Sequence, residues 1–205
     1  MSDSLARRAL ARAAARLNLS GTAFGRLPPL CLMTDDERLA DPAAAAAALP
    51  RGSLVIIRAS DDHTRATLAF RFSGLAKTRG LIVLVASDPS LAARTSADGL
   101  HLPEARAQEA SHWRAAYPGW LITVSVHSLR ALSRVSHADA VFVAPVFTTG
   151  SHPGRRSLSP MRANAMARLS RVPVYALGGI TAANAGRISG ANYAGLAAIS
   201  SLSTD

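Results

Sequence analysis

Eight short apolar runs at regular spacing constrain this chain of 205 residues more than any other feature. Each run is continuous rather than alternating, as is typical of parallel strands that are buried on both faces. The runs cover residues 30–34, 54–58, 81–86, 99–102, 121–126, 140–143, 172–177 and 195–199. Segments of helical composition separate them, at 41–49, 62–79, 90–95, 105–116, 128–136, 159–170 and 181–190.

This strand–helix alternation predicts an α/β fold, a (β/α)8 TIM barrel, over residues 27–205. A doubly wound open sheet is the structural competitor, but the chain lacks a GxGxxG turn. The segment after the last run is too short for an eighth outer helix, whereas 1–26 contains an additional predicted helix at 3–17. We expect this N-terminal helical extension to cover the barrel where the eighth helix is missing, or to close its bottom. Its Arg-rich, amphipathic composition is also found in transit peptides.

The net charge of +10 suggests nucleic-acid binding at first sight, but the details argue against it. The basic residues are scattered, and aromatic residues make up only 5% of the chain, which leaves few platforms for stacking bases. Attraction to small phosphorylated anions is the better interpretation. No apolar run is long enough to cross a membrane. The single cysteine, Cys31, lies in an apolar run, so we expect a core residue and a reducing, cytoplasmic location.

Polar residues follow the apolar runs, at the points where the predicted strands end. In a barrel of parallel strands all these ends meet at one rim, which carries the chemistry in barrel enzymes. The sequence therefore predicts a functional site at that rim, and the candidates along the chain are Asp35, Arg58, Asp88, His101, Ser125, His127, Thr149, Ser151 and His152.

Two glycines and two serines make the most specific group at the rim. Gly178 and Gly179 follow the seventh run, and Ser200 and Ser201 follow the eighth. Glycine lets a ligand approach the backbone closely, and free N–H groups in adjoining turns can hold a phosphate. We expect these four residues to form a phosphate cradle. The alternative is that the two glycines only turn the chain into the next helix.

His127 is the candidate acid–base residue, because a neutral imidazole can accept and return a proton near neutral pH. The alternative is a rim histidine that is bonded to a backbone carbonyl. His101 is a second rim histidine. Metal binding has little support, because Glu104 is the only carboxylate that could join Asp88, and magnesium prefers carboxylates together with substrate phosphates.

The segments "LCLMTD", "SADGLHLPE", "ITVSVHS", "ADAVFVAPVFTTGSHPG", "VPVYALGGIT" and "ANYAGLAAISSL" resemble the thiamine phosphate synthase and thiazole tautomerase family. They occur in the family's order and spacing over about residues 28–202. The resemblance implies a (β/α)8 barrel and a role in thiamine biosynthesis, with a phosphorylated thiazole as ligand.

The synthase branch of that family joins a pyrimidine diphosphate to a thiazole phosphate and releases pyrophosphate, with Mg²⁺. Its pattern is only partly present, since Arg58 and Asp88 match while two lysines are replaced by Ser60 and His152. In the stretch that carries the second magnesium ligand of that branch, this chain has Arg106.

The tautomerase branch matches better between the fourth and fifth runs, through "HLPE" and "SVHS". The resemblance implies that His127 transfers a proton on a thiazole carboxylate phosphate, without a metal or other cofactor. We therefore predict a tautomerase-like isomerase, with Arg58 facing the carboxylate and with Thr149, Ser151 and His152 near the phosphate. The alternatives are a divergent synthase, with Mg²⁺ at Asp88, and a non-catalytic binding protein for thiazole or thiamine phosphates. A homodimer is left open, and neither a nucleic-acid nor a membrane partner is expected.

Overall fold

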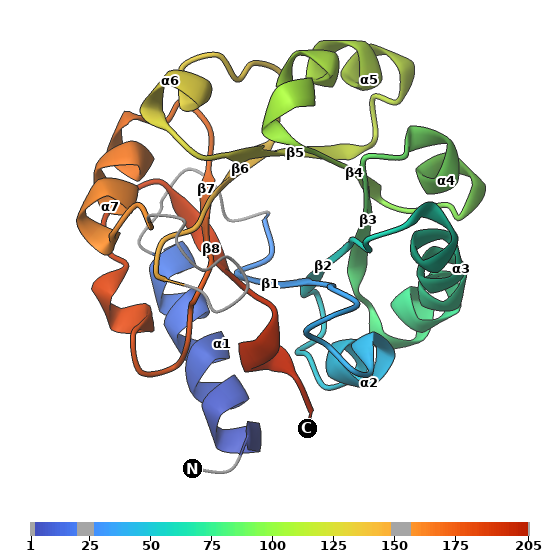
Figure 1. Ribbon diagram of the computed structural model, residues 1–205, viewed down its shortest axis with the longest axis horizontal. Helices are drawn as coiled ribbons and strands as arrows, with labels where there is room; N and C mark the ends of the chain where they lie inside the picture. Colours follow the sequence, from blue (N-terminus) through green and yellow to red (C-terminus); the bar gives the residue numbers. More distant parts are fainter. Residues whose placement is uncertain (1–2, 20–26, 149–156, 205) are drawn as a thin grey trace.

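The protein is a closed barrel of parallel strands surrounded by helices, as Figure 1 shows. This computed structural model describes residues 3–19, 27–148 and 157–204. Each strand pairs with the next along the chain, and the eighth pairs back with the first in parallel register. The predicted (β/α)8 barrel is therefore confirmed.

The strands lie within two residues of the predicted runs at every boundary. They are β1 (Leu30–Met33), β2 (Leu54–Ile57), β3 (Ile82–Ala86), β4 (Gly99–Leu102), β5 (Leu121–Val126), β6 (Ala140–Val143), β7 (Val174–Leu177) and β8 (Tyr193–Ala198). The α-helices are α1 (Asp3–Leu19), α2 (Pro42–Ala47), α3 (Asp62–Arg79), α4 (Pro89–Arg94), α5 (Ala110–Ala116), α6 (Leu129–Leu132) and α7 (Pro160–Leu169). Short 3₁₀ helices are η1 (Glu104–Glu109), η2 (Ala185–Arg187) and η3 (Ser200–Leu202).

The predicted helix over 181–190 is wrong, because only the single turn η2 forms there. The side chain of Asn184 explains the loss: its Oδ1 accepts from Thr181 N at 2.8 Å, and its Nδ2 donates to Gly179 O at 2.7 Å. These bonds stabilise a turn, which competes with a helical backbone. The predicted helix over 128–136 is also shortened, to the one turn of α6.

Three of the outer helices begin in the same way, with a capping residue followed by proline. Asp41, Asp88 and Ser159 are the N-caps of α2, α4 and α7, and each side-chain oxygen accepts from a backbone N–H in the first turn. Proline at the next position has no N–H to leave unsatisfied, and its φ suits a helix. These dipeptides explain where the three helices begin.

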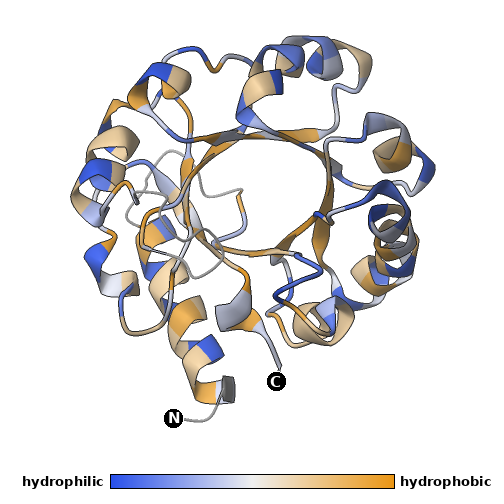
Figure 2. Cartoon of the chain, in the orientation of Figure 1, coloured by the Kyte–Doolittle hydropathy of each residue, from blue (hydrophilic) through white to orange (hydrophobic). Residues whose placement is uncertain are grey.

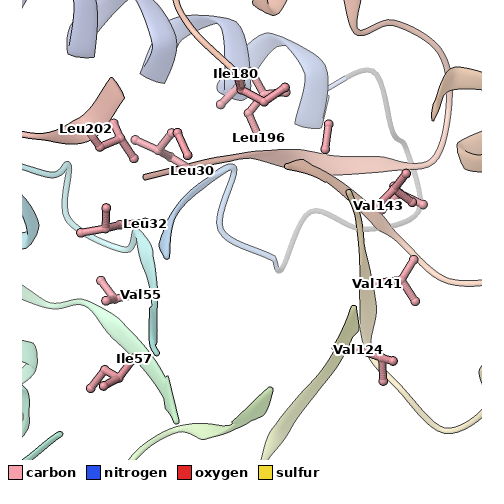
Figure 3. Packing of buried hydrophobic residues seen from close by; sticks show 14 of the residues in the cluster. Leu30, Leu32, Val55, Ile57, Val124, Val141, Val143, Ile180, Leu196 and Leu202 are labelled. Atoms are coloured by element: carbon pink, nitrogen blue, oxygen red, sulfur yellow. The ribbon is translucent and has the colours of Figure 1, made fainter. Parts of the chain in front are cut away.

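Alternate residues of each strand face opposite sides of the barrel wall, and both sides are apolar. One buried cluster, which includes Met33, Ile56, Leu84 and Tyr175, fills the interior of the barrel. The larger cluster lies between the strands and the helices, and Figure 3 shows part of it. Figure 2 shows the same arrangement, with hydrophobic strands inside and polar colour on the outer helices. Within the described ranges, no helix is long and apolar enough to span a bilayer.

Helix α1 packs against the outside of the barrel beside β8 and β1 (Figure 1), where an eighth outer helix would otherwise lie. Leu10, Ala14 and Leu17 form its buried face. Polar contacts reinforce the packing, since Asn18 Nδ2 donates to Ala194 O at 2.6 Å and Arg7 Nη1 donates to Ser203 O at 2.6 Å. Of the two arrangements expected for this helix, the structure therefore has the one in which it covers the barrel where the eighth helix is missing.

Replacing Leu10 by alanine should destabilise the protein by about 2–5 kcal/mol, because the side chain is fully buried between α1 and the barrel. The free energy of unfolding in urea is the measurement. Leu5→Ala on the same helix is the matched control, since Leu5 is 55% exposed and its loss should cost less than about 1 kcal/mol. Equal losses in the two variants would contradict the packing of α1.

Candidate active site

The main cavity of the described chain lies over the carboxyl ends of the strands and has a volume of about 960 Å³. Three groups of polar residues in its lining matter for the chemistry. The arginine cluster is Arg38, Arg58 and Arg65; the histidine group is His101, Ser125 and His127; and the glycine–serine loops are Gly178, Gly179, Ser200 and Ser201. The predicted convergence of strand ends thus brings eight of the thirteen candidate residues into one pocket: Arg58, His101, Ser125, His127, Gly178, Gly179, Ser200 and Ser201.

His127 follows β5 directly and is held at two atoms. Its Nδ1 lies 2.7 Å from Ala144 O, and its backbone N donates to Glu104 Oε2 at 2.6 Å. A carbonyl oxygen only accepts, so Nδ1 carries the hydrogen, and Nε2 is the nitrogen with a lone pair in the neutral ring. The carbonyl contact considered in the sequence analysis is present, and it orients the imidazole in the pocket.

His101 on β4 is buried in the barrel interior rather than exposed at the rim. Its Nδ1 lies 2.8 Å from Thr123 Oγ1 and its Nε2 lies 2.9 Å from Ser125 Oγ, while Phe142 packs against its ring. Burial, together with the charge of Arg58, lowers the pKa of His101 to about 3. The ring is therefore neutral at physiological pH, and it orients the hydroxyl of Ser125 at the floor of the pocket.

Asp35 lies behind the arginine cluster and does not line the pocket itself. Its Oδ2 accepts from Arg38 Nη2 at 2.5 Å and from Arg58 Nη1 at 2.6 Å. Burial raises the pKa of this carboxyl, but the hydrogen bonds and charges of the two arginines outweigh burial and hold the pKa below its usual value. Asp35 therefore stays ionised and positions both guanidinium groups.

The glycine–serine loops come together after β7 and β8. Both glycines have positive φ, at +98° for Gly178 and +65° for Gly179, and an added Cβ would lie 2.7 Å from Pro145 Cα or 2.8 Å from Thr148 O. Ser201 Oγ donates to Ile180 O at 2.7 Å and so joins the two loops.

The glycines are therefore required by backbone conformation and by close contact with the segment after β6. In the described part of the chain, no hydrogen bond uses the backbone N–H groups of Gly179, Ser200 or Ser201. These N–H groups are available to an anion.

The described residues do not form a cluster of side chains that would hold a Mg²⁺ ion without a ligand phosphate. They contain no group of three or more His, Cys, Asp or Glu side chains that could hold a metal. Asp88 is the N-cap of α4, its Oδ1 accepting from Leu91 N at 2.9 Å, and it does not line the pocket. Arg106 donates to Ser87 O at 2.6 Å, immediately beside Asp88, and its guanidinium group also pairs with the carboxylate of Glu109 at 2.7 Å.

Three candidates, Thr149, Ser151 and His152, lie outside the described residues. The prediction missed Glu37, Arg38, Arg65 and Thr181, which line the pocket. Arg38 lies in the turn after β1, only a few residues beyond the end of the strand. This closeness to a strand end was the signal that could have identified it. Arg65 lies on α3, and nothing in the sequence distinguishes it from a surface arginine.

A closed barrel with a polar pocket at the carboxyl ends of its strands defines a class, the (β/α)8 proteins that hold ligands at this face. The chain belongs to the thiamine monophosphate synthase family, whose model matches residues 30–202. A thiamine-phosphate synthase from Chlorobium luteolum is 27% identical over 180 residues, which is 85% of each chain. One from Bordetella pertussis is 32% identical over 178 residues, which is 82% of each chain.

Among solved structures, a thiamine phosphate pyrophosphorylase from Pyrococcus furiosus superposes with a TM-score of 0.69 at 22% identity. It covers 85% of this chain and 86% of its own, and it supports the fold alone. The relatives named above are described as synthases, so the comparisons favour the synthase alternative over the tautomerase that the sequence analysis preferred.

Replacing His101 by glutamine should reduce the acid sensitivity of folding. Because the folded-state pKa is lowered to about 3, the unfolded chain binds a proton that the folded chain does not. The stabilising contribution is fully present above about pH 6.5 and is lost as the pH falls towards 3.

The free energy of unfolding of the wild type should therefore fall more steeply than that of His101→Gln between pH 6 and 4, by up to about 1.4 kcal/mol per pH unit. Urea titrations at several pH values measure this slope. His63→Gln, at an exposed position, is the control and should keep the wild-type slope. Parallel slopes for the wild type and His101→Gln would contradict the burial of a neutral ring.

Proposed function

We propose that this chain is a transferase of the thiamine-phosphate synthase type, which joins a pyrimidine diphosphate to a thiazole phosphate and releases pyrophosphate. The observation that supports the proposal is that two separate sets of residues whose chemistry suits anions, the arginine cluster and the glycine–serine loops, line one pocket. Two phosphorylated substrates need two such groups. The names of the relatives support the same reaction.

In this reaction the bond between the pyrimidine and a diphosphate oxygen breaks, and its electron pair stays on that oxygen. The thiazole forms the new bond to the pyrimidine, and pyrophosphate leaves with the additional negative charge. Positively charged donors that are already oriented stabilise such charge best. Arg58 has this property, because Asp35 accepts from its guanidinium group and the hydroxyl of Thr34 bonds its backbone N–H and C=O.

The glycine–serine loops would hold the thiazole phosphate through backbone N–H groups, which orient without titrating. Holding two reactants in one orientation removes much of the entropic part of the barrier. Ser125, oriented by the neutral ring of His101, contributes a hydroxyl to the lining of the same pocket.

The first test is turnover. Purified protein with pyrimidine diphosphate and thiazole phosphate should release pyrophosphate, with and without added Mg²⁺. Arg58→Gln should lower kcat/KM by about 10²–10³-fold, because it removes a charge aimed at the leaving group. Arg171→Gln is the matched control, since this exposed arginine lies at the opposite end of the barrel, before β7. Absence of turnover by the wild type would refute the transferase proposal.

A second candidate function is the tautomerase-like isomerisation, and the geometry of His127 favours it. Its Nδ1 is held by Ala144 O, so that Nε2 can accept a proton from a ligand in the pocket. The reaction moves one proton and makes the thiazole ring aromatic. In that case Arg58 binds the carboxylate of the thiazole and the glycine–serine loops bind its phosphate.

This candidate is tested by giving the protein the non-aromatic thiazole carboxylate phosphate alone and following the ring absorbance. His127→Gln should slow the conversion by about 10²–10⁴-fold, the usual contribution of a general acid–base. His112→Gln, at an exposed position on α5, is the control. Conversion at the wild-type rate by His127→Gln would contradict the role. If the wild type binds thiazole phosphate but performs neither reaction, the non-catalytic binding protein is supported instead.

A further inference from the structure

Two hydroxyl groups and one imidazole form a hydrogen-bonded row that runs from the barrel interior to the pocket. Thr123 and Ser125 lie on the same side of β5, and His101 on β4 is paired with Thr123 across the sheet. Thr123 Oγ1 lies 2.8 Å from His101 Nδ1, and His101 Nε2 lies 2.9 Å from Ser125 Oγ. Ser125 lines the pocket, whereas Thr123 is fully buried and has no role in the site described above.

The position of one hydrogen on the ring of His101 decides what Ser125 can do. The ring is neutral at physiological pH, so one of its nitrogens donates and the other accepts. If Nδ1 carries the hydrogen, Nε2 accepts from Ser125, and the hydroxyl hydrogen of Ser125 points at the ring. If Nε2 carries the hydrogen, Ser125 accepts it, and its own hydrogen is left for a ligand in the pocket.

The surroundings of Thr123 decide between these two tautomers. In the part of the chain that the structure describes, the hydroxyl of Thr123 has no hydrogen-bond partner other than His101 Nδ1, and the residue is 0% exposed. The neighbouring interior is apolar, with Phe142 packed against the ring of His101. A buried donor without an acceptor is costly, so Thr123 O–H donates to Nδ1. The ring hydrogen therefore lies on Nε2.

We infer that Thr123 and His101 are positioning residues that fix Ser125 as a hydrogen-bond donor to the ligand. Thr123 O–H donates to His101 Nδ1, and His101 Nε2–H donates to Ser125 Oγ. The ligand atom that meets Ser125 is then an acceptor, an oxygen or an unprotonated ring nitrogen, and not an N–H group. Bonds that all run in one direction polarise each other, which strengthens the last donor. The contact with the ligand rests on the proposed transferase function, whereas the direction of the row does not.

The direction of the row is tested by nuclear magnetic resonance of the whole protein, with its histidines labelled with ¹⁵N, near neutral pH. Long-range proton–nitrogen correlations distinguish a protonated ring nitrogen from a bare one, and the signals that are absent from His101→Gln assign the ring. We expect the hydrogen on Nε2 in the wild type and in Thr123→Ser, which keeps the hydroxyl. Thr123→Val removes the hydroxyl at similar volume, so the Nδ1 resonance should shift and the preference for one tautomer should fall.

Thr95→Val is the matched control for the loss of a buried hydroxyl. Thr95 Oγ1 donates to Leu91 O at 2.8 Å, and the residue does not line the pocket. This variant should leave the signals of His101 unchanged, and circular dichroism melts establish that every variant is folded. Three outcomes overturn the inference: a hydrogen on Nδ1 in the wild type, a wild-type His101 spectrum in Thr123→Val, or an equal shift in Thr95→Val.

The effect on the ligand is tested by a double-mutant cycle on kcat/KM of the proposed transfer reaction. Ser125→Ala should lower kcat/KM about tenfold, because it removes a hydrogen bond to the ligand, and Thr123→Val should lower it about threefold, because it weakens the same bond. If Thr123 acts through Ser125, the double variant falls no further than Ser125→Ala alone. Thr123→Ser should restore the wild-type value. Losses that multiply in the double variant contradict the positioning role.

The resonance experiment and the turnover assay fail separately. If the hydrogen lies on Nε2 but the wild type forms no pyrimidine–thiazole product, the transferase proposal fails and the direction of the row stands. If product forms but the hydrogen lies on Nδ1, the transferase proposal stands and the positioning role of Thr123 fails.

Discussion

The pairing of β8 with β1 is the constraint on which the rest of the structure depends. In an open sheet with the same strand order, the segments after β1 and β2 would lie at one edge and those after β7 and β8 at the other. Closure brings them onto one rim, where the arginine cluster and the glycine–serine loops line the same pocket. Gly195 makes the pairing possible, because a Cβ at this position would lie 1.9 Å from Pro29 O.

Within the pocket, charge is organised by residues that are themselves held in place. Asp35 is buried and ionised between two arginines, whereas His101 is buried and neutral between two hydroxyl groups. The first fixes guanidinium groups and the second orients Ser125 without adding a charge. Such fixed groups need little reorganisation when charge develops on a ligand, which is the property that an electrostatic catalyst requires.

The sequence predicted the barrel because buried parallel strands leave a strong signal: short continuous apolar runs at regular intervals. It also predicted most rim residues, since closure places every strand end at one face. It failed over 181–190, where the side-chain amide of Asn184 bonds the backbone and stabilises a turn. The composition of this segment is typical of a helix and does not reveal the turn. It missed Arg65 because the packing of α3 against the barrel determines which residues of this helix face the cavity, and the sequence does not show that packing. The choice between the two reactions was not determined either, because it depends on the charge around the bound ligand.

The position of α1 has a consequence for how the chain is made. This helix precedes every strand of the barrel in the chain, yet the carbonyl that Asn18 binds belongs to Ala194, 176 residues later. Until β8 has been synthesised, the leucine face of α1 lacks the strand that it contacts most. Complete docking of α1 therefore waits for the last strand of the barrel, and part of its apolar face stays uncovered while the strands between are translated.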